Sequence, residues 1–432
     1  MAITDNSAAR QLNRPDRPRL LDALGPGLIT GASDDDPSGI ATYSQAGAAF
    51  GFALIWTLLF TYPLMCAIQL ISAEIGRVTG RGIAANMRKR YPAFVLYPLV
   101  GLLVFANVIN LGADLGAMAA ALRLILPGPQ WAYVAAFAIL VAVLEVFMRY
   151  ASYASVLRWL TLSLFAYVAT VFVVGVPWGT VAVHLVVPHI EWTSGYFTVV
   201  VAVFGTTISP YLFFWQASQE VEETKEDPTA TPLIRAPDQA PRELARIRLD
   251  TLVGMGASNL VALFIVLTTA ATLNAHGISN IETSADAAKA LRPIAGDFAF
   301  VLFALGIVGT GLLAVPVLAG SAAYALGETL GWRIGLAQRP GRAPAFYWAI
   351  TAGILVGALL NFSPLDPIKA LFWSAVINGV AAVPIMALIM LIASQRKVMG
   401  EFVVKPWLKA LGWAATAAMA AAAAGMIATW GA

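Results

Sequence analysis

The stretch "GASDDDPSGIATYSQAG", residues 31–47, places three consecutive aspartates, a proline and a glycine inside the first apolar segment of the chain. One ionised Asp at the centre of a membrane span costs about 2.5–3.5 kcal/mol, so three that faced lipid would cost on the order of 8–10 kcal/mol. Pro37 removes a backbone donor and Gly39 accepts almost any backbone dihedral, so together they predict that the helix unwinds here. Unwound backbone is tolerated at this depth only beside a cavity or other protein.

Composition places the rest of the chain in a lipid bilayer. The 432 residues are 59% hydrophobic and only 12% charged, with a mean hydropathy of +0.75, whereas a soluble domain carries about 25% charged residues. The single cysteine, Cys66, lies in an apolar run, which excludes a disulfide framework and a Cys-rich metal site. The net charge of +3 is small and the basic residues lie between apolar runs, so we expect no nucleic-acid partner.

Eleven apolar runs predict eleven transmembrane helices, since a hydrocarbon core needs about 20 residues per helix. Placing the N-terminus inside leaves all but four of the 27 Lys and Arg residues on the cytoplasmic side, as the positive-inside rule requires. We therefore predict an all-α, multi-pass protein of the plasma or inner membrane, with the C-terminus outside. The predicted spans are 23–45, 50–73, 95–125, 131–148, 153–175, 197–220, 249–273, 297–326, 345–361, 367–393 and 408–430.

A second interruption, "GTTISPYL", lies in the sixth span at residues 205–212. Thr206, Thr207, Ser209 and the carbonyls before Pro210 offer neutral oxygens to a ligand. The alternative is a proline kink whose Ser and Thr hydroxyls bond back to their own helix. Paired with the first interruption, the stretch favours a site.

Five spans separate the two interruptions, so the two halves are predicted to be inverted five-helix repeats. Interrupted helices at matching positions of such repeats indicate a transporter site near the membrane midplane. The loop at 221–248 is charged and Pro-rich and predicts a mobile linker with a short amphipathic end. The predicted organisation is a cytoplasmic tail (1–22), a first repeat of spans one to five (23–175), an extracellular loop (176–196), a second repeat of spans six to ten (197–393) that contains the loop 221–248, and a final loop and span (394–432).

The chemistry expected at the first interruption is that of a cation site. Carboxylate and carbonyl oxygens form a hard ligand set, which suits hard divalent cations. Asp36 lies beside the proline, and we predict that it binds the cation. For Asp34 and Asp35 the more common alternative is to cap a half-helix or to pair with a basic residue.

These two stretches resemble the broken helices of the NRAMP family of divalent metal transporters, and the similarity covers most of the chain. The family implies a LeuT-like fold and alternating access. Its first-helix motif, Asp-Pro-Gly-Asn, corresponds to "DPSG" at 36–39, and its sixth-helix motif, Met-Pro-His, corresponds to "SPY" at 209–211. The resemblance adds Tyr211 to the candidate site. It also adds Asn378, because the tenth helix of the family contributes a polar residue.

The departures from the family motifs point to its magnesium-transporter branch. A methionine thioether is a soft ligand that favours Mn, Fe or Cd over Mg, and Ser209 replaces it here. Gly39 replaces the asparagine, which removes an amide ligand and is expected to widen the site. Mg²⁺ dehydrates reluctantly and keeps several waters. The predicted cargo is therefore Mg²⁺, with Mn²⁺ also carried, and the alternative is an ordinary proton-coupled Mn²⁺ or Fe²⁺ transporter.

Proton coupling is expected to be weak or absent. The two histidine positions of the family's sixth helix read Tyr211 and Gln216, and its third-helix acidic pair reads Asp114 and Ala117. The chain's three histidines all fall in predicted outer loops, so no near-neutral proton carrier lies inside the membrane. These histidines are His184, His189 and His276.

One question about polar residues stays open on the sequence. Asn107, Asn110 and Asp114 share one face of the third span, where they either bond neighbouring helices or line the permeation route.

A Na⁺-coupled carrier of amino acids or organic solutes is a remote alternative, since three aspartates would repel a substrate carboxylate. The chain contains no His-Glu-x-x-His motif and no room for a signalling domain. We expect a monomer without enzymatic activity or a resident cofactor, with the metal as cargo.

Overall fold

The computed structural model describes residues 26–148, 162–363 and 366–430, which form helices and loops without strands. Eight helical segments in this part of the chain are long and apolar enough to cross a membrane, and a ninth apolar helix is shorter. The first predicted span is divided between two short helices, and the fifth is represented by its second half. The all-helical prediction is confirmed, while the tail at 1–22 and the start of the fifth span lie outside the described residues.

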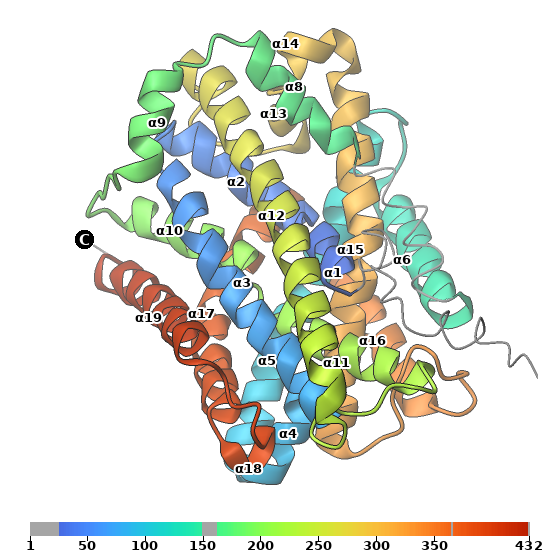
Figure 1. Ribbon diagram of the computed structural model, residues 1–432. Helices are drawn as coiled ribbons and strands as arrows, with labels where there is room; N and C mark the ends of the chain where they lie inside the picture. The colour runs from blue at the N-terminus through green and yellow to red at the C-terminus, as the bar shows by residue number, and fades with distance from the viewer. Residues whose placement is uncertain (1–25, 149–161, 364–365, 431–432) are drawn as a thin grey trace, which may run out of the picture.

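The first half of the chain begins with a broken helix and contains long helices that cross the whole molecule (Figure 1). The predicted outer loop at 176–196 contains one short helix, α9. The helices of this half are α1 (Pro26–Asp34), α2 (Pro37–Phe50), α3 (Ile55–Thr79), α4 (Ile83–Arg90), α5 (Ala93–Arg123), α6 (Gln130–Phe147), α8 (Phe165–Val173) and α9 (Trp178–Val186).

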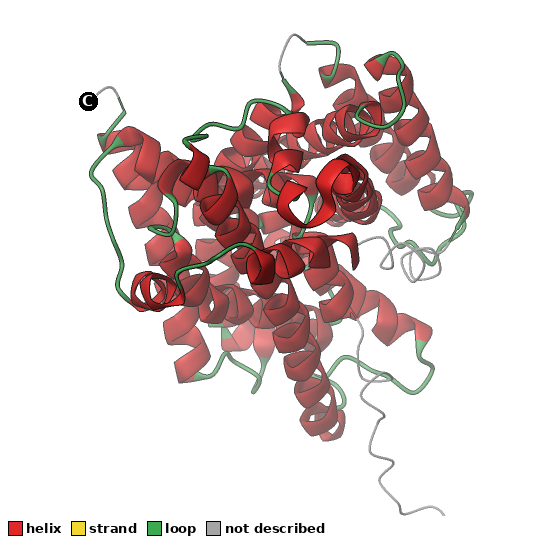
Figure 2. Cartoon of the chain, turned by 90° about the horizontal axis from the view of Figure 1, so that it is seen from above, coloured by secondary structure: helices red, strands yellow, loops and turns green. Residues whose placement is uncertain are grey.

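The second half begins with another broken helix. Short helices connect its long members at both ends of the molecule (Figures 1 and 2). The helices of this half are α10 (Ser194–Thr207), α11 (Pro210–Glu226), α12 (Ala240–Thr272), α13 (Ser284–Lys289), α14 (Arg292–Ala295), α15 (Ala299–Leu330), α16 (Pro344–Leu360), α17 (Pro367–Ala393), α18 (Arg396–Met399) and α19 (Pro406–Ala428).

The segment 221–248 differs from its prediction as a mobile linker, because α11 and α12 extend into it from both sides. Ion pairs account for the difference. Arg246 lies 2.6 Å from Glu220 and 3.3 Å from Glu243. Arg77 of α3, almost fully buried, lies 3.4 Å from the same Glu243. These charges stabilise helical ends that the sequence alone marks as solvated.

Helices from the two halves pack in pairs, with α5 along α15 and α1 along α12, and within the second half α10 packs along α17. Small residues permit the closest approaches, as is common between membrane helices. A Cβ added at Gly31 of α1 would lie 2.3 Å from the carbonyl oxygen of Gly254 in α12. The start of α1 is also fixed, since the Asp250 carboxylate accepts hydrogen bonds from the N–H groups of Gly27 at 2.7 Å and Leu28 at 3.0 Å. The first broken helix is thus held against α12.

Candidate functional site

The first break lies where the sequence predicts it. Helix α1 ends at Asp34 and α2 begins at Pro37, whose fixed φ suits the first helical position. Asp36 between them is extended, with φ −67° and ψ 168°, and it caps α2. Its Oδ1 accepts hydrogen bonds from the Gly39 N–H at 2.7 Å and from the Ser38 hydroxyl at 2.6 Å. Proline and the capping aspartate together therefore end one helix and start the next.

The second carboxylate oxygen of Asp36 connects the break to two other helices. Asp36 Oδ2 accepts from Asn110 Nδ2 of α5 at 3.0 Å and from the Tyr211 hydroxyl of α11 at 3.4 Å. Asn110 is itself oriented by Ser374 of α17, whose hydroxyl donates to Asn110 Oδ1 at 2.7 Å. Four hydrogen-bond donors therefore surround this buried carboxylate. A cation that reached Oδ2 would replace its long contact with Tyr211.

At the second break the residue before the proline is Ser209, whose hydroxyl bonds differently from the Asp36 carboxylate. Helix α10 ends at Thr207 and α11 begins at Pro210, and Ser209 between them is extended. The Ser209 hydroxyl lies 2.8 Å from the carbonyl oxygen of Gly205 and 2.9 Å from that of Thr206. It therefore bonds back to the helix that it ends, which is the alternative considered for this residue. In this conformation its proton is directed at α10 and not at Asp36.

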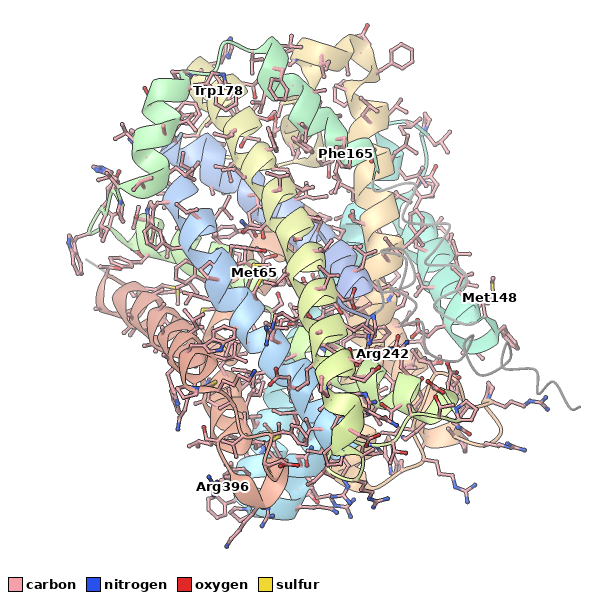
Figure 3. All side chains as sticks on the ribbon, viewed as in Figure 1. Met65, Met148, Phe165, Trp178, Arg242 and Arg396 are labelled. Carbon is pink, nitrogen blue, oxygen red and sulfur yellow. The ribbon has the colours of Figure 1, made fainter. Side chains whose placement is uncertain are left out.

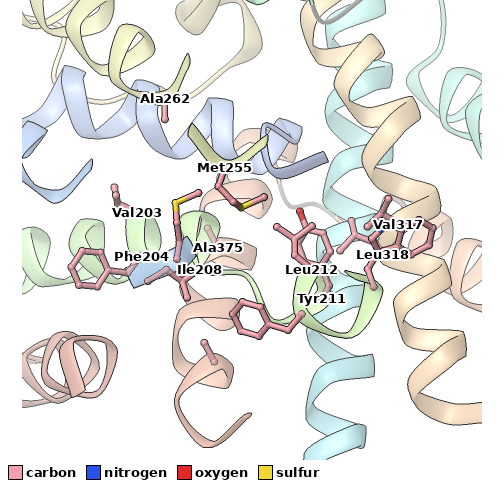
Figure 4. Close-up of a cluster of buried hydrophobic side chains, with 14 of the residues drawn as sticks. Val203, Phe204, Ile208, Tyr211, Leu212, Met255, Ala262, Val317, Leu318 and Ala375 are labelled. Atoms are coloured by element: carbon pink, nitrogen blue, oxygen red, sulfur yellow. The ribbon is translucent and has the colours of Figure 1, made fainter. Parts of the chain in front are cut away.

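Apolar side chains surround the second break (Figure 4). Ile208 and Leu212, on either side of the proline, are each 1% exposed, and Met255 of α12 and Leu318 of α15 are also buried. Water is therefore excluded from this side of the site. An apolar surface without water strengthens the electrostatic interactions of a neighbouring charge.

The two breaks meet at Gly39 and Thr206. A Cβ added at Gly39 would lie 3.2 Å from Thr206 Oγ1 and 3.3 Å from the Asp34 carbonyl oxygen. The expectation that Gly39 widens the site is therefore wrong for this conformation, because neighbouring atoms occupy the space left by the missing side chain. Asn378 of α17 is buried, and its side-chain amide makes no hydrogen bond within the described residues. The hydrogen bonds thus bring Tyr211 to Asp36 but do not bring Asn378 there.

The three polar residues of α5 divide between the two roles left open. Asn107 bonds a neighbouring helix, donating to the Leu318 carbonyl at 3.1 Å and to the Ser321 hydroxyl at 2.8 Å. Asn110 belongs to the site. Asp114, one turn further on, is fully buried, and its carboxylate interacts with the backbone N–H of Ser38 in α2. Its spacing of four from Asn110 is the sequence signal that would have added Asp114 to the candidate ligands.

Asp34 and Asp35 share a partner that the sequence did not identify, the Ser258 hydroxyl of α12. The distances from Ser258 Oγ are 2.7 Å to Asp34 Oδ2 and 3.1 Å to Asp35 Oδ1. Neither a helix cap nor a basic partner, the predicted alternatives, is present for them among the described residues. With Asp36 and Asp114 they make four buried carboxylates without an ion pair in the described ranges. A bound cation would offset this concentration of negative charge.

Two broken helices in a multi-pass helical protein, with buried carboxylates at the first break, define a transporter of the LeuT-like fold. A mutant of the Eremococcus coleocola manganese transporter superposes with a TM-score of 0.70 at 17% identity, covering 98% of this chain and 88% of the other. A nucleobase-cation-symport-1 family transporter superposes with a TM-score of 0.57 at 15% identity, covering 94% and 92%. These likenesses confirm the predicted fold class.

Residues 27–429 match the family described as natural resistance-associated macrophage protein-like, and the chain belongs to this NRAMP family. It is 26% identical over 412 residues to the divalent metal cation transporter MntH of Deinococcus radiodurans, covering 91% of this chain and 87% of the relative. It is 25% identical over 428 residues to the protein of the same name from Klebsiella pneumoniae, covering 96% of each. The family resemblance stated from the two broken helices is confirmed.

Proposed function

We propose that this protein is a secondary transporter that carries Mg²⁺, and also Mn²⁺, across the plasma membrane by alternating access and without proton coupling. Membership of the NRAMP family makes it a divalent metal cation transporter and not an enzyme. The observation that carries the proposal is Asp36, a buried carboxylate at a helix break with donors from α2, α5 and α11 and no basic partner in the described residues.

The ligand chemistry around Asp36 supports a hard cation. Its contacts come from hydroxyl, amide and backbone groups, and Ser209 stands where the family motif has a soft thioether. Oxygen ligands suit Mg²⁺, which binds through one or two carboxylates and keeps several waters. Because Gly39 is crowded, a hydrated ion needs the two breaks to separate, and alternating access supplies such a movement.

The absence of coupling is supported by where the titratable groups lie. Among the described residues, His184 lies on α9, His189 in the following loop and His276 beyond the end of α12, all in connections that the positive-inside rule predicts to lie outside. Gln216, at a family histidine position, is buried, and it donates to the Thr251 hydroxyl at 2.9 Å and accepts from Gln69. An amide does not titrate, so this position has no proton to exchange.

One observation favours the alternative, a proton-coupled Mn²⁺ or Fe²⁺ transporter. The single hydroxyl proton of Ser258 cannot be donated to both Asp34 and Asp35, although both lie within hydrogen-bond distance. A second hydrogen bond in this group would require a proton on one of the two carboxyl groups. A carboxyl that holds a proton in one state and releases it in another would be a proton carrier.

Uptake into liposomes separates the two candidates. The purified protein is reconstituted with a trapped Mg²⁺ indicator and, in parallel, a trapped pH indicator under a clamped membrane potential. We expect Mg²⁺ uptake that external Mn²⁺ inhibits, with no internal acidification. Mn²⁺ uptake that excludes Mg²⁺ would overturn the assigned cargo, and proton movement that follows the metal would establish the coupled alternative.

A further inference from the structure

A second candidate site lies at the end of the molecule opposite α9, α13 and α14, away from the two breaks (Figure 1). A cavity of about 480 Å³ opens among the end of α3, the helix α4, the connection between α11 and α12, and the helix α18. We call it the basic pocket, because it is lined by several cationic side chains and by no Asp or Glu. The cationic side chains are Arg81, Lys89, Arg90, Arg235 and Lys397.

These five charges have no counter-charge. None of them forms an ion pair within the described ranges. Arg246 on the same side of the membrane is different, because Glu220, Glu223 and Glu243 all lie within 3.3 Å of it. The chain therefore supplies carboxylates to neutralise the partly exposed Arg246 and supplies none to the basic pocket. Five like charges around one concavity raise the local concentration of anions.

Hydrogen bonds between distant segments shape the walls of the basic pocket. The N–H of Ile234 donates to the carbonyl oxygen of Val78 at 3.2 Å, which fixes the α11–α12 connection against the end of α3. The Asn86 side chain donates to the Thr79 hydroxyl at 3.0 Å. A guanidinium nitrogen of Arg90 donates to the Lys397 carbonyl, which joins α4 to α18. These two helices lie at the same end in Figure 1, and Figure 3 places Arg396, next to the pocket, at that end.

The positive-inside rule accounts for basic residues on this side of the membrane, but it does not require them to surround a cavity. Guanidinium groups bind phosphate oxygens in pairs, and ammonium groups bind them as point charges. A volume of about 480 Å³ is within the range of small-molecule sites. We propose that the basic pocket binds a phosphate-bearing polyanion from the cytoplasmic side, supplied as a soluble phosphoanhydride or as the headgroup of an anionic lipid. The proposal does not depend on the metal that the protein carries.

The test compares the full-length protein with a pocket variant, Arg81→Gln with Arg235→Gln and Lys397→Gln. Inorganic pyrophosphate is titrated into the detergent-solubilised protein by calorimetry, and the thermal midpoint is followed on addition of cardiolipin. Because the pocket variant loses three cationic contacts, it should bind on the order of 100-fold more weakly than the wild type.

The matched control removes the same charge from the same face outside the pocket, by Arg333→Gln with Arg339→Gln and Arg342→Gln. These arginines are exposed in the connection between α15 and α16. We expect this control to retain binding to within about threefold, because a charge outside the pocket is screened by salt. An equal loss in both variants would reduce the effect to net charge and overturn the site.

A second pocket variant keeps all five basic residues. Ile234, 44% exposed, lines the pocket, and Ile234→Glu places a competing carboxylate there. It should weaken binding while the protein keeps its elution volume and helical content. Pyrophosphate binding without a cardiolipin response identifies a soluble ligand, and the reverse identifies a lipid headgroup. If neither probe binds the wild type, or if Ile234→Glu leaves binding unchanged, the proposal is wrong.

Discussion

Asp36 and Ser209 occupy the same position in the two broken helices, directly before the proline that begins the second half of each. The Asp36 side chain bonds forward into α2 and across to α5 and α11. The Ser209 hydroxyl bonds backward to two carbonyls of α10. A proline therefore breaks both helices, but the residue before it bonds neighbouring helices at the first break and only its own helix at the second. Pro37 and Pro210 therefore explain the breaks, whereas the side chain before each proline decides whether the break accepts hydrogen bonds from neighbouring helices.

The largest effect on transport is expected at Asp36. Replacing Asp36 by Ala removes the acceptor shared by all four donors, and we expect Mg²⁺ uptake into liposomes to fall by roughly 100-fold, because a lost charged partner costs about 3 kcal/mol. Asp36→Asn keeps an oxygen that can cap α2 but removes the charge. An equal loss in Asp36→Asn assigns the effect to charge, and normal uptake in Asp36→Ala would exclude Asp36 from the transport route.

Asp114 provides the next comparison, because it is a fully buried carboxylate one helical turn from Asn110, which bonds Asp36. Asp114→Asn removes a negative charge without changing the shape, and we expect the Mg²⁺ concentration for half-maximal uptake to rise about 10-fold. Asn107→Ala on the same face of α5 is the control, since Asn107 bonds α15. That control should lower thermal stability and leave the half-maximal concentration unchanged. The reverse pattern would place Asn107, and not Asp114, beside the ion.

A smaller effect tests whether the two breaks act as one site. Gly39→Ala brings a Cβ to 3.2 Å from Thr206 Oγ1, and such overpacking costs about 1–3 kcal/mol. We expect uptake to fall about 5-fold and the loss to be partly recovered in Gly39→Ala with Thr206→Ala. The recovery is partial because the Asp34 carbonyl oxygen remains 3.3 Å away. Additive losses in the double variant would mean that the two breaks are energetically independent.

The sequence predicts the breaks well because their causes are local. Proline at 37 and 210 removes a backbone donor whatever surrounds it, and a charge inside an apolar run needs a polar partner wherever it lies. The positive-inside distribution and the span lengths are also properties of the chain itself. These features predict the helical class, the two broken spans and Asp36 as the carboxylate at the first break.

The contacts made by tertiary packing could not be read from the chain. Ser258 reaches Asp34 and Asp35 only because α1 packs along α12, more than 200 residues away in sequence. The helical character of 221–248 depends in the same way on Arg246 meeting Glu220. A glycine in the sequence shows a missing side chain but not what fills its place, so the sequence alone predicts an open site at Gly39.

The smallest effect is expected at Ser209, and it is the sharpest test of the contrast between the two breaks. Ser209→Ala removes hydroxyl contacts that lie within α10, so thermal stability should fall by about 1 kcal/mol and Mg²⁺ uptake should change by less than about 2-fold. Ser209→Met tests the family's thioether at the same position, and it should shift uptake toward Mn²⁺ over Mg²⁺. A loss in Ser209→Ala as large as that in Asp36→Ala would mean that the hydroxyl leaves α10 during transport and binds the ion. In that case the kink is only one state of the second break, and both breaks contribute side chains to the cargo site.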